Sequence, residues 1–289
     1  MANFHKRVPE NVPGEFFVDV TCIDCDTCRQ LAPATFGETG AYAYVYAQPQ
    51  TADETRQALR ALLACPTGSI GTRHRHNLTA VRADFPFHLD DGVFYCGFNS
   101  PKSYGGNSYV VVQHGDGNWL IDSPKFLPHL VRQFENMGGL ARIFLTHSDD
   151  VADAAKYARH FAAQRIIHQK ELAAQPDAEI VLDSNEPVPF GPDFLVIPTP
   201  GHTQGHCVLL YGQRFLFTGD HLWWERDTQQ LGASRDYCWY SWAQQTASMA
   251  QLQHFDFTWV LPGHGQRMHL PQEQMRQELH ALVQRMQQP

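Results

Sequence analysis

Four cysteines in the first quarter of the chain restrict what that region can fold into. Cys22, Cys25 and Cys28 are each separated by two residues, and Cys65 follows much later, directly before Pro66. Three thiolates from one tight loop and a fourth from a remote helix end can hold a cubane iron–sulfur cluster, and loop amides can point at its sulfurs. Neither a further closely spaced cysteine nor a second triplet follows. The spacing therefore predicts one 4Fe-4S cluster bound by these four cysteines.

A structural zinc site and a disulfide framework are the alternatives for these cysteines. Two-residue spacings also suit zinc, but structural zinc sites usually pair two such knuckles. The remaining cysteines, Cys96, Cys207 and Cys238, make the total of seven odd, and a chain of 289 residues is long enough to be stable without disulfides. A triplet followed by a distant Cys-Pro is typical of a cluster, and the segment resembles bacterial-type ferredoxins with a single cluster.

The chain is long enough for two domains. The helix that delivers Cys65 is predicted to begin after a cap at Thr51 and to end at Ala64, so the first domain should end shortly after the last cluster cysteine. From about Phe85 the pattern changes to strands that alternate with helices. The expected organisation is a ferredoxin-like domain at 1–72, a linker at 73–88 and a second domain at 89–289.

Composition limits the partners and the location. The net charge is −8, acidic and basic residues are interspersed, and no run is rich in Lys or Arg, so neither nucleic acid nor an anionic membrane is expected as a partner. No stretch reaches the roughly 18 to 20 apolar residues of a membrane span, and the first residues lack the pattern of a cleaved signal. A cytoplasmic protein is expected.

Residues of the types that bind metals fall just after predicted strands of the second domain. His147, His202, Asp220 and His264 each lie in the loop that follows such a strand. Because loops at strand ends meet at one edge of a sheet, these side chains are expected to form a metal pocket. The expected strands are 107–113, 119–122, 142–146, 194–197, 208–211, 215–217 and 259–261, the first two joined by a turn at 114–118, and the expected helices are 127–136, 151–163 and 271–289.

Several short motifs occur in a fixed order. They are Thr-His at 146–147, Gly-His-Thr-x-Gly-His at 201–206, Thr-Gly-Asp-His at 218–221 and Gly-His-Gly at 263–265, and they follow Asn-Ser-Tyr at 107–109 and Leu-Ile-Asp at 120–122. Together they resemble the metallo-β-lactamase superfamily over about residues 89–289. The resemblance implies an αββα sandwich with a metal pocket at one sheet edge, so the fold class expected for the whole chain is α+β. The family includes hydrolases of β-lactams, thioesters and phosphodiesters, and iron enzymes such as persulfide dioxygenases and flavodiiron proteins.

The first metal motif departs from the family pattern, which is His-x-His-x-Asp-His. After His147 the chain reads Ser-Asp-Asp-Val-Ala-Asp-Ala. Aligned without gaps, Asp149 replaces the second histidine. With a two-residue bulge, Asp153 recovers the aspartate, but an alanine still stands where the last histidine should be. In either alignment, a second metal would lack the histidine ligand that this loop supplies in the family.

Carried over from the family, the ligands of a first metal are His147, His202 and Asp220. A second metal would keep only His264, one aspartate and the shared Asp220. Two imidazoles and one carboxylate with open positions suit ferrous iron, and they resemble the mononuclear iron site of the persulfide dioxygenases. One mononuclear iron is expected, with zinc or manganese as alternatives because Asp149 can add a hard oxygen ligand.

Three functions fit these features. An oxidoreductase would pass electrons between the cluster and the pocket iron, with a small-molecule substrate and an unidentified redox partner. This function gives both centres a role, whereas hydrolysis needs no electrons and would leave the cluster without one. A hydrolase of an ester, thioester or lactam would use metal-bound water that Asp149 or Asp153 orients. A non-catalytic sensor or electron-transfer protein would have lost the metal of its pocket. A homodimer that brings the two centres together across chains is left open as an alternative to transfer within one chain.

Overall fold

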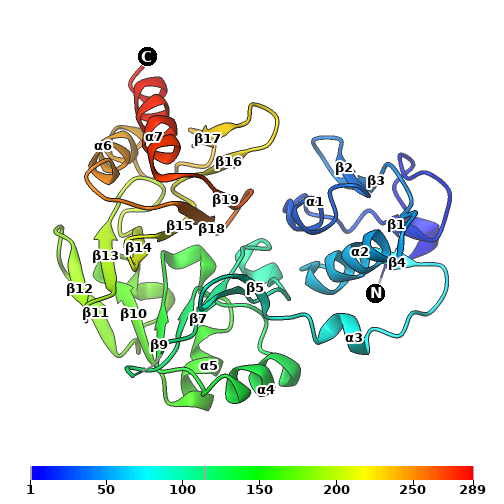
Figure 1. The fold of residues 1–289 in the computed structure, drawn as a ribbon, viewed down its shortest axis with the longest axis horizontal. Coiled ribbons are helices and arrows are strands. Elements are labelled where there is room, and N and C mark those ends of the chain that lie inside the picture. Colours follow the sequence, from blue (N-terminus) through cyan, green and yellow to red (C-terminus); the bar gives the residue numbers. More distant parts are fainter. Residues whose placement is uncertain (1, 114, 289) are drawn as a thin grey trace. The chain divides into compact units, whose positions relative to one another are not determined.

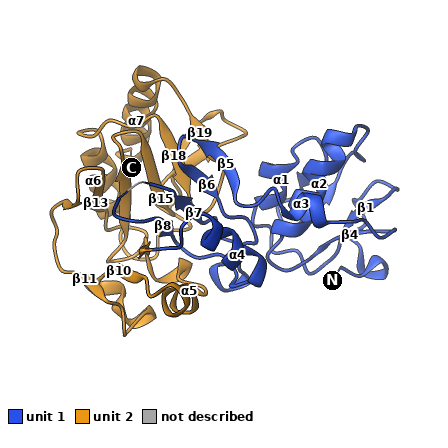
Figure 2. Cartoon of the chain, turned by 60° about the horizontal axis from the view of Figure 1, so that its bottom comes forward, with its two compact units in different colours: residues 1–140 blue, residues 141–289 orange. Residues whose placement is uncertain are grey.

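The chain forms two compact units in a computed structural model, which describes residues 2–113 and 115–288 (Figure 2). The first unit is Met1–Leu140 and the second is Ala141–Pro289. All four cluster cysteines belong to the first unit, and the four residues of the predicted metal pocket belong to the second. The turn predicted at 114–118 includes His114, which lies outside the described residues.

Two helices and four short strands form the region that carries the cysteines (Figure 1). Helix α2 (Ala52–Ala64) begins, as predicted, after Thr51, whose hydroxyl accepts from the Glu54 amide while the Glu54 carboxylate accepts from the Thr51 amide. It ends at Cys65, because the following Pro66 cannot continue a helix. The other elements are η1 (Phe4–Lys6), β1 (Phe16–Val18) paired antiparallel with β4 (Ile70–Thr72), α1 (Thr27–Leu31), and β2 (Phe36–Glu38) paired antiparallel with β3 (Ala43–Val45).

A buried arginine in α1 fixes the loop between the cysteines. The Arg29 guanidinium lies 2.5 Å from Asp24 Oδ1, 2.7 Å from Asp26 Oδ1 and 2.9 Å from Glu38 Oε2, and the Arg29 side chain is 7% exposed. Burial by itself would lower the pKa of Arg29, but the carboxylates of Asp26 and Asp24 raise it, so the guanidinium stays charged. Because Asp24 and Asp26 stand between ligand cysteines, Arg29 holds the ligand loop in one conformation.

The rest of the first unit is an antiparallel meander with two helices. Its elements are α3 (Thr79–Arg82), β5 (Phe87–Asp90), β6 (Val93–Tyr95), η2 (Pro101–Ser103), β7 (Tyr109–Val111), β8 (Trp119–Ile121) and α4 (Pro128–Asn136). Strand β5 pairs with β6, β6 with β7 and β7 with β8. The β7–β8 hairpin and helix α4 confirm the predictions for these segments. Helix α3 and the start of β5 lie within the stretch that we expected to be a linker.

The second unit contains a parallel set of three strands and a six-stranded sheet. The parallel set is β9 (Arg142–Phe144), β10 (Gln164–His168) and β11 (Ile180–Leu182), with η3 (Ser148–Asp150), α5 (Ala154–Phe161) and η4 (Gln169–Ala174) between its strands. The order of the sheet is β12 (Val188–Phe190), β13 (Phe194–Pro198), β14 (Cys207–Tyr211), β15 (Phe215–Gly219), β18 (Trp259–Pro262) and β19 (Met268–His269). The hairpin β16 (Trp223–Glu225) and β17 (Gln230–Gly232) and the helices α6 (Trp242–Leu252) and α7 (Gln272–Met286) complete the unit.

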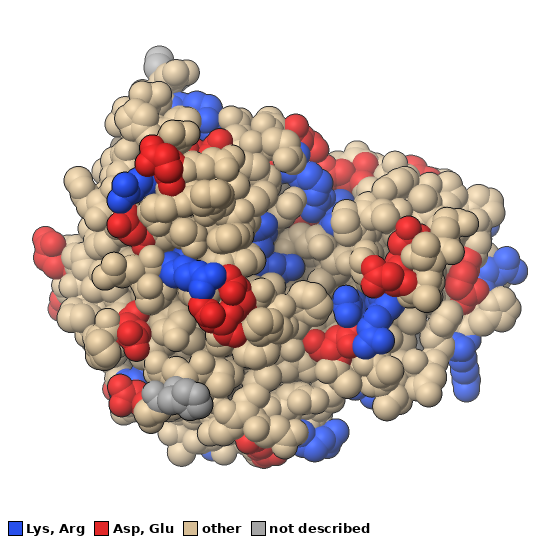
Figure 3. All heavy atoms as spheres, viewed as in Figure 1, with Lys and Arg blue, Asp and Glu red and all other residues tan. Residues whose placement is uncertain are grey.

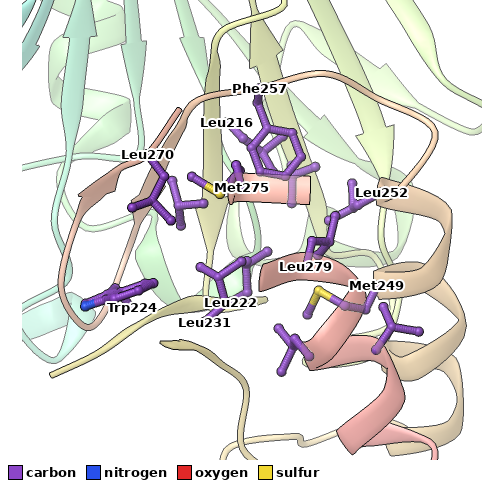
Figure 4. Packing of buried hydrophobic residues seen from close by; sticks show 14 of the residues in the cluster. Leu216, Leu222, Trp224, Leu231, Met249, Leu252, Phe257, Leu270, Met275 and Leu279 are labelled. Carbon is purple, nitrogen blue, oxygen red and sulfur yellow. The ribbon is translucent and has the colours of Figure 1, made fainter. Parts of the chain in front are cut away.

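A large apolar core joins α6 and α7 to the six-stranded sheet (Figure 4). Leu216 from β15, Leu252 from α6 and Leu279 from α7 are almost fully buried in it, together with Phe257. Burial of one such side chain stabilises a fold by about 1.5 to 3 kcal/mol. This core holds β15 and β18 in place, and the loops that carry Asp220 and His264 follow these two strands.

Most of the strands and helices predicted for this region are confirmed, but further elements are present that were not predicted. The strands not predicted are β10, β11, β12, β16, β17 and β19. The helix predicted over 151–163 begins only at Ala154, because the three residues after His147 form the 3₁₀ turn η3 instead. Helix α6 was not predicted, since its buried positions include Gln245 and Ser248, which do not contribute to an apolar pattern.

Charged side chains of both signs are interspersed on the face of the molecule that Figure 3 shows. Of the helices formed by residues 2–113 and 115–288, none has both the length and the apolar character that a bilayer crossing requires.

Candidate metal centre and iron–sulfur site

The four cysteines predicted to hold the cluster line one pocket of the first unit. Cys28 is buried, and the other three are half-buried. Cys22 Sγ accepts a hydrogen bond from the Asp24 amide and Cys65 Sγ from the Ser69 amide, both at 3.4 Å. Amides directed at sulfur offset the negative charge of cluster thiolates, so these residues fit a 4Fe-4S cluster.

The protonation of these thiols also suits a metal site. Burial raises the pKa of Cys25 to about 11 and raises the pKa of Cys28 well above its ordinary value. Thiols in such surroundings stay protonated at neutral pH unless a metal takes them as thiolates. Loading of the cluster is therefore coupled to release of the thiol protons.

Four side chains of the second unit converge on one point. His147 Nε2 lies 3.6 Å from Asp220 Oδ2 and 4.0 Å from Asp149 Oδ2. His202 Nε2 lies 3.6 Å and 3.7 Å from the same two oxygens. Ligand atoms about 2.1 Å from a tetrahedral ion lie about 3.4 Å from one another, so the distance from each nitrogen to the Asp220 oxygen is close to the spacing around a single ion. Asp149 lies within 4.8 Å of the ligand atoms of the two histidines, in a group that does not include Asp220.

The ligand nitrogens of both histidines are prepared for a metal. Nε2 of His147 and Nε2 of His202 are buried and make no hydrogen bond within the described part of the chain. His202 Nδ1 lies 2.5 Å from the carbonyl oxygen of Tyr237, which can only accept, so the ring proton sits on Nδ1 and the Nε2 lone pair is available. His147 Nδ1 lies 2.9 Å from the Thr146 hydroxyl. A buried polar atom left without a partner costs about 1 to 3 kcal/mol, and a bound ion removes that cost.

The charges of the four groups also favour a cation. Burial lowers the pKa of His147 to about 4, so this imidazole is neutral at neutral pH. Burial raises the pKa of Asp220, but the histidines around it, His264 first, outweigh this effect and hold it below the ordinary value. The His202 imidazole likewise lowers the pKa of Asp149. Burial by itself would lower the pKa of His202, but its hydrogen bond to Asp149 and the charge of Asp220 raise it, so any proton on His202 Nε2 must leave when a metal binds. A neutral imidazole beside ionised carboxylates is the protonation state in which these side chains bind metals.

A second cluster of polar groups lies on the other side of Asp220. His264 Nδ1 lies 2.8 Å from Asp220 Oδ1. Asp150 is buried, and one of its oxygens lies within 4.8 Å of the ligand atoms of His147 and Asp220. A Cβ atom at position 263 would lie 2.6 Å from Asp150 Oδ2 and 2.8 Å from Asp220 Oδ1, so only glycine fits there. His264 therefore contacts a carboxylate that also faces the first metal position.

The structure brings to the pocket one aspartate that the sequence favoured and one that it did not. Asp149 lies at the pocket as expected. The other predicted catalytic residue, Asp153, stands at the start of α5, where its Oδ1 lies 3.0 Å from Lys156 Nζ, and it belongs to neither group of described residues whose ligand atoms lie together. Asp150 takes the place that we had given to Asp153, because the turn η3 brings residues 148–150 over the pocket. The role of Asp153 stays a prediction.

Two buried residues that are not ligands hold the pocket loops together. Glu171 in η4 is 5% exposed; its Oε2 accepts from the Ser148 amide at 3.1 Å and its Oε1 from the Gly205 amide at 2.6 Å. It thereby connects the loop after β9 to the loop between β13 and β14. His206 Nε2 accepts from the Asp220 amide at 3.3 Å. Sequence reasoning missed Glu171, since it lies in an irregular segment and in no motif.

Exposed aromatic rings border the pocket on one side. Tyr237 and Trp239 are 61% and 63% exposed, and the Trp239 ring centre lies 5.9 Å from that of His202. Trp224, also among the aromatic residues near Asp220 in the sequence, lies in the apolar core instead. The aromatic residues of this region therefore divide between pocket rim and core.

Residues 18–72 match the family described as the 4Fe-4S single cluster domain of Ferredoxin I. The match includes all four cysteines of the pocket. The hydroxyacylglutathione hydrolase of Citrobacter koseri is 29% identical over 127 residues, which are 43% of this chain and 50% of that protein. A lactamase-like protein of Pestalotiopsis microspora is 26% identical over 62% of this chain and 53% of its own length. The chain spans about half the length of the curated relatives it matches.

Solved structures show the fold of the larger part. The metallo-β-lactamase FIM-1 from Pseudomonas aeruginosa, in its mono-zinc form, aligns with a TM-score of 0.53 at 19% identity over 70% of this chain and 95% of its own. The DIM-1 metallo-β-lactamase aligns with a TM-score of 0.52 at 18% identity, over 68% and 95%. The chain joins a region that matches a 4Fe-4S ferredoxin family to a domain with the metallo-β-lactamase fold. The predicted fold is thus confirmed.

Each part of the chain implies its own inorganic group. The ferredoxin domain implies an iron–sulfur cluster, and the metallo-β-lactamase fold implies a metal in the pocket. Within the superfamily motif, this chain keeps His147 but has Asp149 where a second histidine is expected. The distances from His147 and His202 to the Asp220 oxygen fit one ion, with Asp149 beside the same two histidines.

Proposed function

We propose that this chain is an oxidoreductase in which a single metal, iron, exchanges electrons with the 4Fe-4S cluster during conversion of a small-molecule substrate. The ligands would be His147, His202 and Asp220, with Asp149 as a fourth. A site with two imidazoles and one or two carboxylates suits ferrous iron, which supplies open coordination positions and one-electron chemistry when bound.

The observation that carries this proposal is the presence of one complete set of donors in a chain that also has a cluster domain. Each of the two Nε2 atoms lies 3.6 to 4.0 Å from an oxygen of Asp149 and from an oxygen of Asp220. Activation of water for hydrolysis uses no electrons, so a hydrolase would give the ferredoxin domain no part in the reaction. An external one-electron partner would exchange electrons with the cluster.

The side chains of the pocket would have separate roles. The Tyr237 carbonyl holds His202 in the tautomer that presents Nε2, and His264 orients Asp220 through Oδ1. The Asp149 side chain is 51% exposed, in contrast to His147 at 0% and His202 at 2%. Asp149 therefore stands on the open side of the pocket, where the carboxylate oxygen that does not bind the metal can accept a proton from the substrate.

Metal counting on anaerobically purified protein tests the proposal. We expect about four irons with matching sulfide, plus about one iron without sulfide, and a reduced cluster visible by electron paramagnetic resonance. His202→Ala should remove only the extra iron, and Cys25→Ala only the cluster. His254→Ala, which changes an exposed histidine of the same unit, is the matched control and should keep both. Loss of both centres in either single variant, or a pocket without any metal, would contradict the proposal.

A metal-dependent hydrolase is the second candidate, because the hydroxyacylglutathione hydrolases are among the relatives of known name. In that case Asp149 would orient a metal-activated water toward an ester or thioester carbonyl. Zinc in the pocket, together with thioester hydrolysis at the same rate in oxidised and dithionite-reduced protein, would favour this function over electron transfer.

A further inference from the structure

Three described residues outside the matched 18–72 region contact residues that line the cluster pocket, and all three belong to the first unit. They lie in the segment between β6 and β7, residues 97–107, and just after β8. The segment contributes Asn99 and Gly105. The third residue is Lys125, which lies four residues after the end of β8. The Lys125 amide donates to the Phe98 carbonyl at 3.1 Å, which joins the two places.

Gly105 lies directly against a cluster ligand. A Cβ atom at this position would lie 2.7 Å from Cys25 Cβ, 2.9 Å from Cys25 Sγ and 3.0 Å from Pro66 Cγ. Real Cβ atoms do not approach other atoms this closely, and φ at Gly105 is +88°, so glycine is required on both counts. The segment thus closes the pocket beside Cys25.

Asn99 connects the segment to the hydroxyl next to the same ligand. Asn99 is fully buried, and its Nδ2 donates to Thr27 Oγ1 at 3.0 Å and to the Gly105 carbonyl at 2.6 Å. Thr27 Oγ1 lies 3.4 Å from Cys25 Sγ. Because Thr27 Oγ1 accepts from Asn99, its own proton is free to point at Cys25, as a thiolate ligand needs.

Lys125 places a positive charge at the fourth ligand. Its half-buried Nζ lies 3.5 Å from the Cys65 carbonyl oxygen. Residues outside the matched region therefore act beside two of the cluster ligands. Asn99 orients the Thr27 hydroxyl at Cys25, and Lys125 supplies the ammonium group at Cys65.

We propose that Asn99, Gly105 and Lys125 complete the cluster site from outside the ferredoxin domain, and that the Lys125 ammonium sets the reduction potential of the cluster. Reduction adds one electron to a cluster that is already negative, with no bond made or broken. A positive charge beside it stabilises the reduced state more than the oxidised state, so it raises the midpoint potential. The assignment rests on the cluster alone and not on the function proposed for the pocket metal.

An anaerobic redox titration of the full chain, followed by electron paramagnetic resonance of the reduced cluster, tests the role of Lys125. Lys125→Met should shift the midpoint to more negative values, and Lys125→Arg, which keeps the charge, should leave it near the wild-type value. Lys6→Met is the control, because it removes an exposed positive charge of the same unit that solvent screens. An equal midpoint in Lys125→Met and wild type, or an equal shift in Lys6→Met, would overturn the assignment.

Cluster retention gives a second readout. If Lys125→Met loses the cluster, retention in Lys125→Arg supports a role for the charge, whereas loss in both variants would assign Lys125 to packing and refute its electrostatic role. Gly105→Ala should lower the iron and sulfide content or speed cluster decay relative to Gly40→Ala. Gly40 has a similar φ of +83° but no atom within 4 Å of an added Cβ, so this pair separates contact with Cys25 from backbone strain. Equal retention in the two alanine variants would show that the segment does not complete the site.

Discussion

Replacement of Glu171 by glutamine is expected to weaken metal binding without changing any ligand. The Glu171 carboxylate accepts two backbone hydrogen bonds, one from each of the two loops that carry His147 and His202, at 3.1 Å and 2.6 Å. A glutamine has the same size but only one acceptor oxygen, and its amide group would meet the other backbone N–H. A hydrogen bond to a charged group contributes about 1.5 to 3 kcal/mol, so one of the two loops loses about this much restraint.

The expected loss can be stated as an affinity. If the whole of this free energy is lost from metal binding, 1.5 to 3 kcal/mol corresponds to a dissociation constant that is roughly 10-fold to 150-fold larger. This agrees with the roughly 10-fold to 100-fold effects typical of residues that support metal ligands. Titration of metal-free pocket with Zn²⁺ against a chromophoric chelator measures the constant directly.

The control is the same substitution at another carboxylate of this unit. The Glu179 carboxylate accepts hydrogen bonds of 2.7 to 3.0 Å from Arg165, a residue of strand β10. Neither residue belongs to a loop that carries a metal ligand. Glu179→Gln should lower stability while it leaves zinc affinity unchanged. If Glu171→Gln binds zinc as tightly as the wild type, the reasoning is refuted, because contacts other than those of Glu171 would then hold the two loops in position.

Three further predictions concern the pocket, the cluster loop and the core. Asp149→Asn should weaken Zn²⁺ binding by at least roughly 10-fold, and Asp153→Asn should not, as measured by the same titration; the reverse order would return Asp153 to the site. Arg29→Met removes the charged hydrogen bonds to the half-buried carboxylates of Asp24 and Asp26, at a cost of about 1.5 to 3 kcal/mol, so cluster absorbance should decay faster in chelator, and an unchanged decay rate would contradict this. Leu216→Ala should lower the free energy of unfolding in denaturant by about 2 to 5 kcal/mol, because Leu216 is fully buried in the core of the six-stranded sheet, and a loss below about 1 kcal/mol would mean that the site collapses.

The sequence by itself determined the elements whose chemistry depends on local spacing. The cysteine triplet and the Cys-Pro after a capped helix predicted the cluster domain, since both the ligand loop and the helix end are local features. The positions of His147, His202, Asp220 and His264 after strands followed from apolar runs, and the side chains do meet in one unit. Strand ends converge at one sheet edge whatever the details of the intervening chain.

Only the tertiary structure decided which groups lie beside these ligands. The chain forms a 3₁₀ turn after His147, so Asp150 lies among the ligand atoms of His147 and Asp220, in a group that does not include Asp153. A shift of a few residues in one loop cannot be read from a pattern. Glu171 and Lys125 act through contacts with residues 23 to 60 positions away in the sequence. Such contacts depend on how separate elements pack, because a carboxylate or an ammonium acquires its role from the groups that folding places around it and not from its neighbours along the chain.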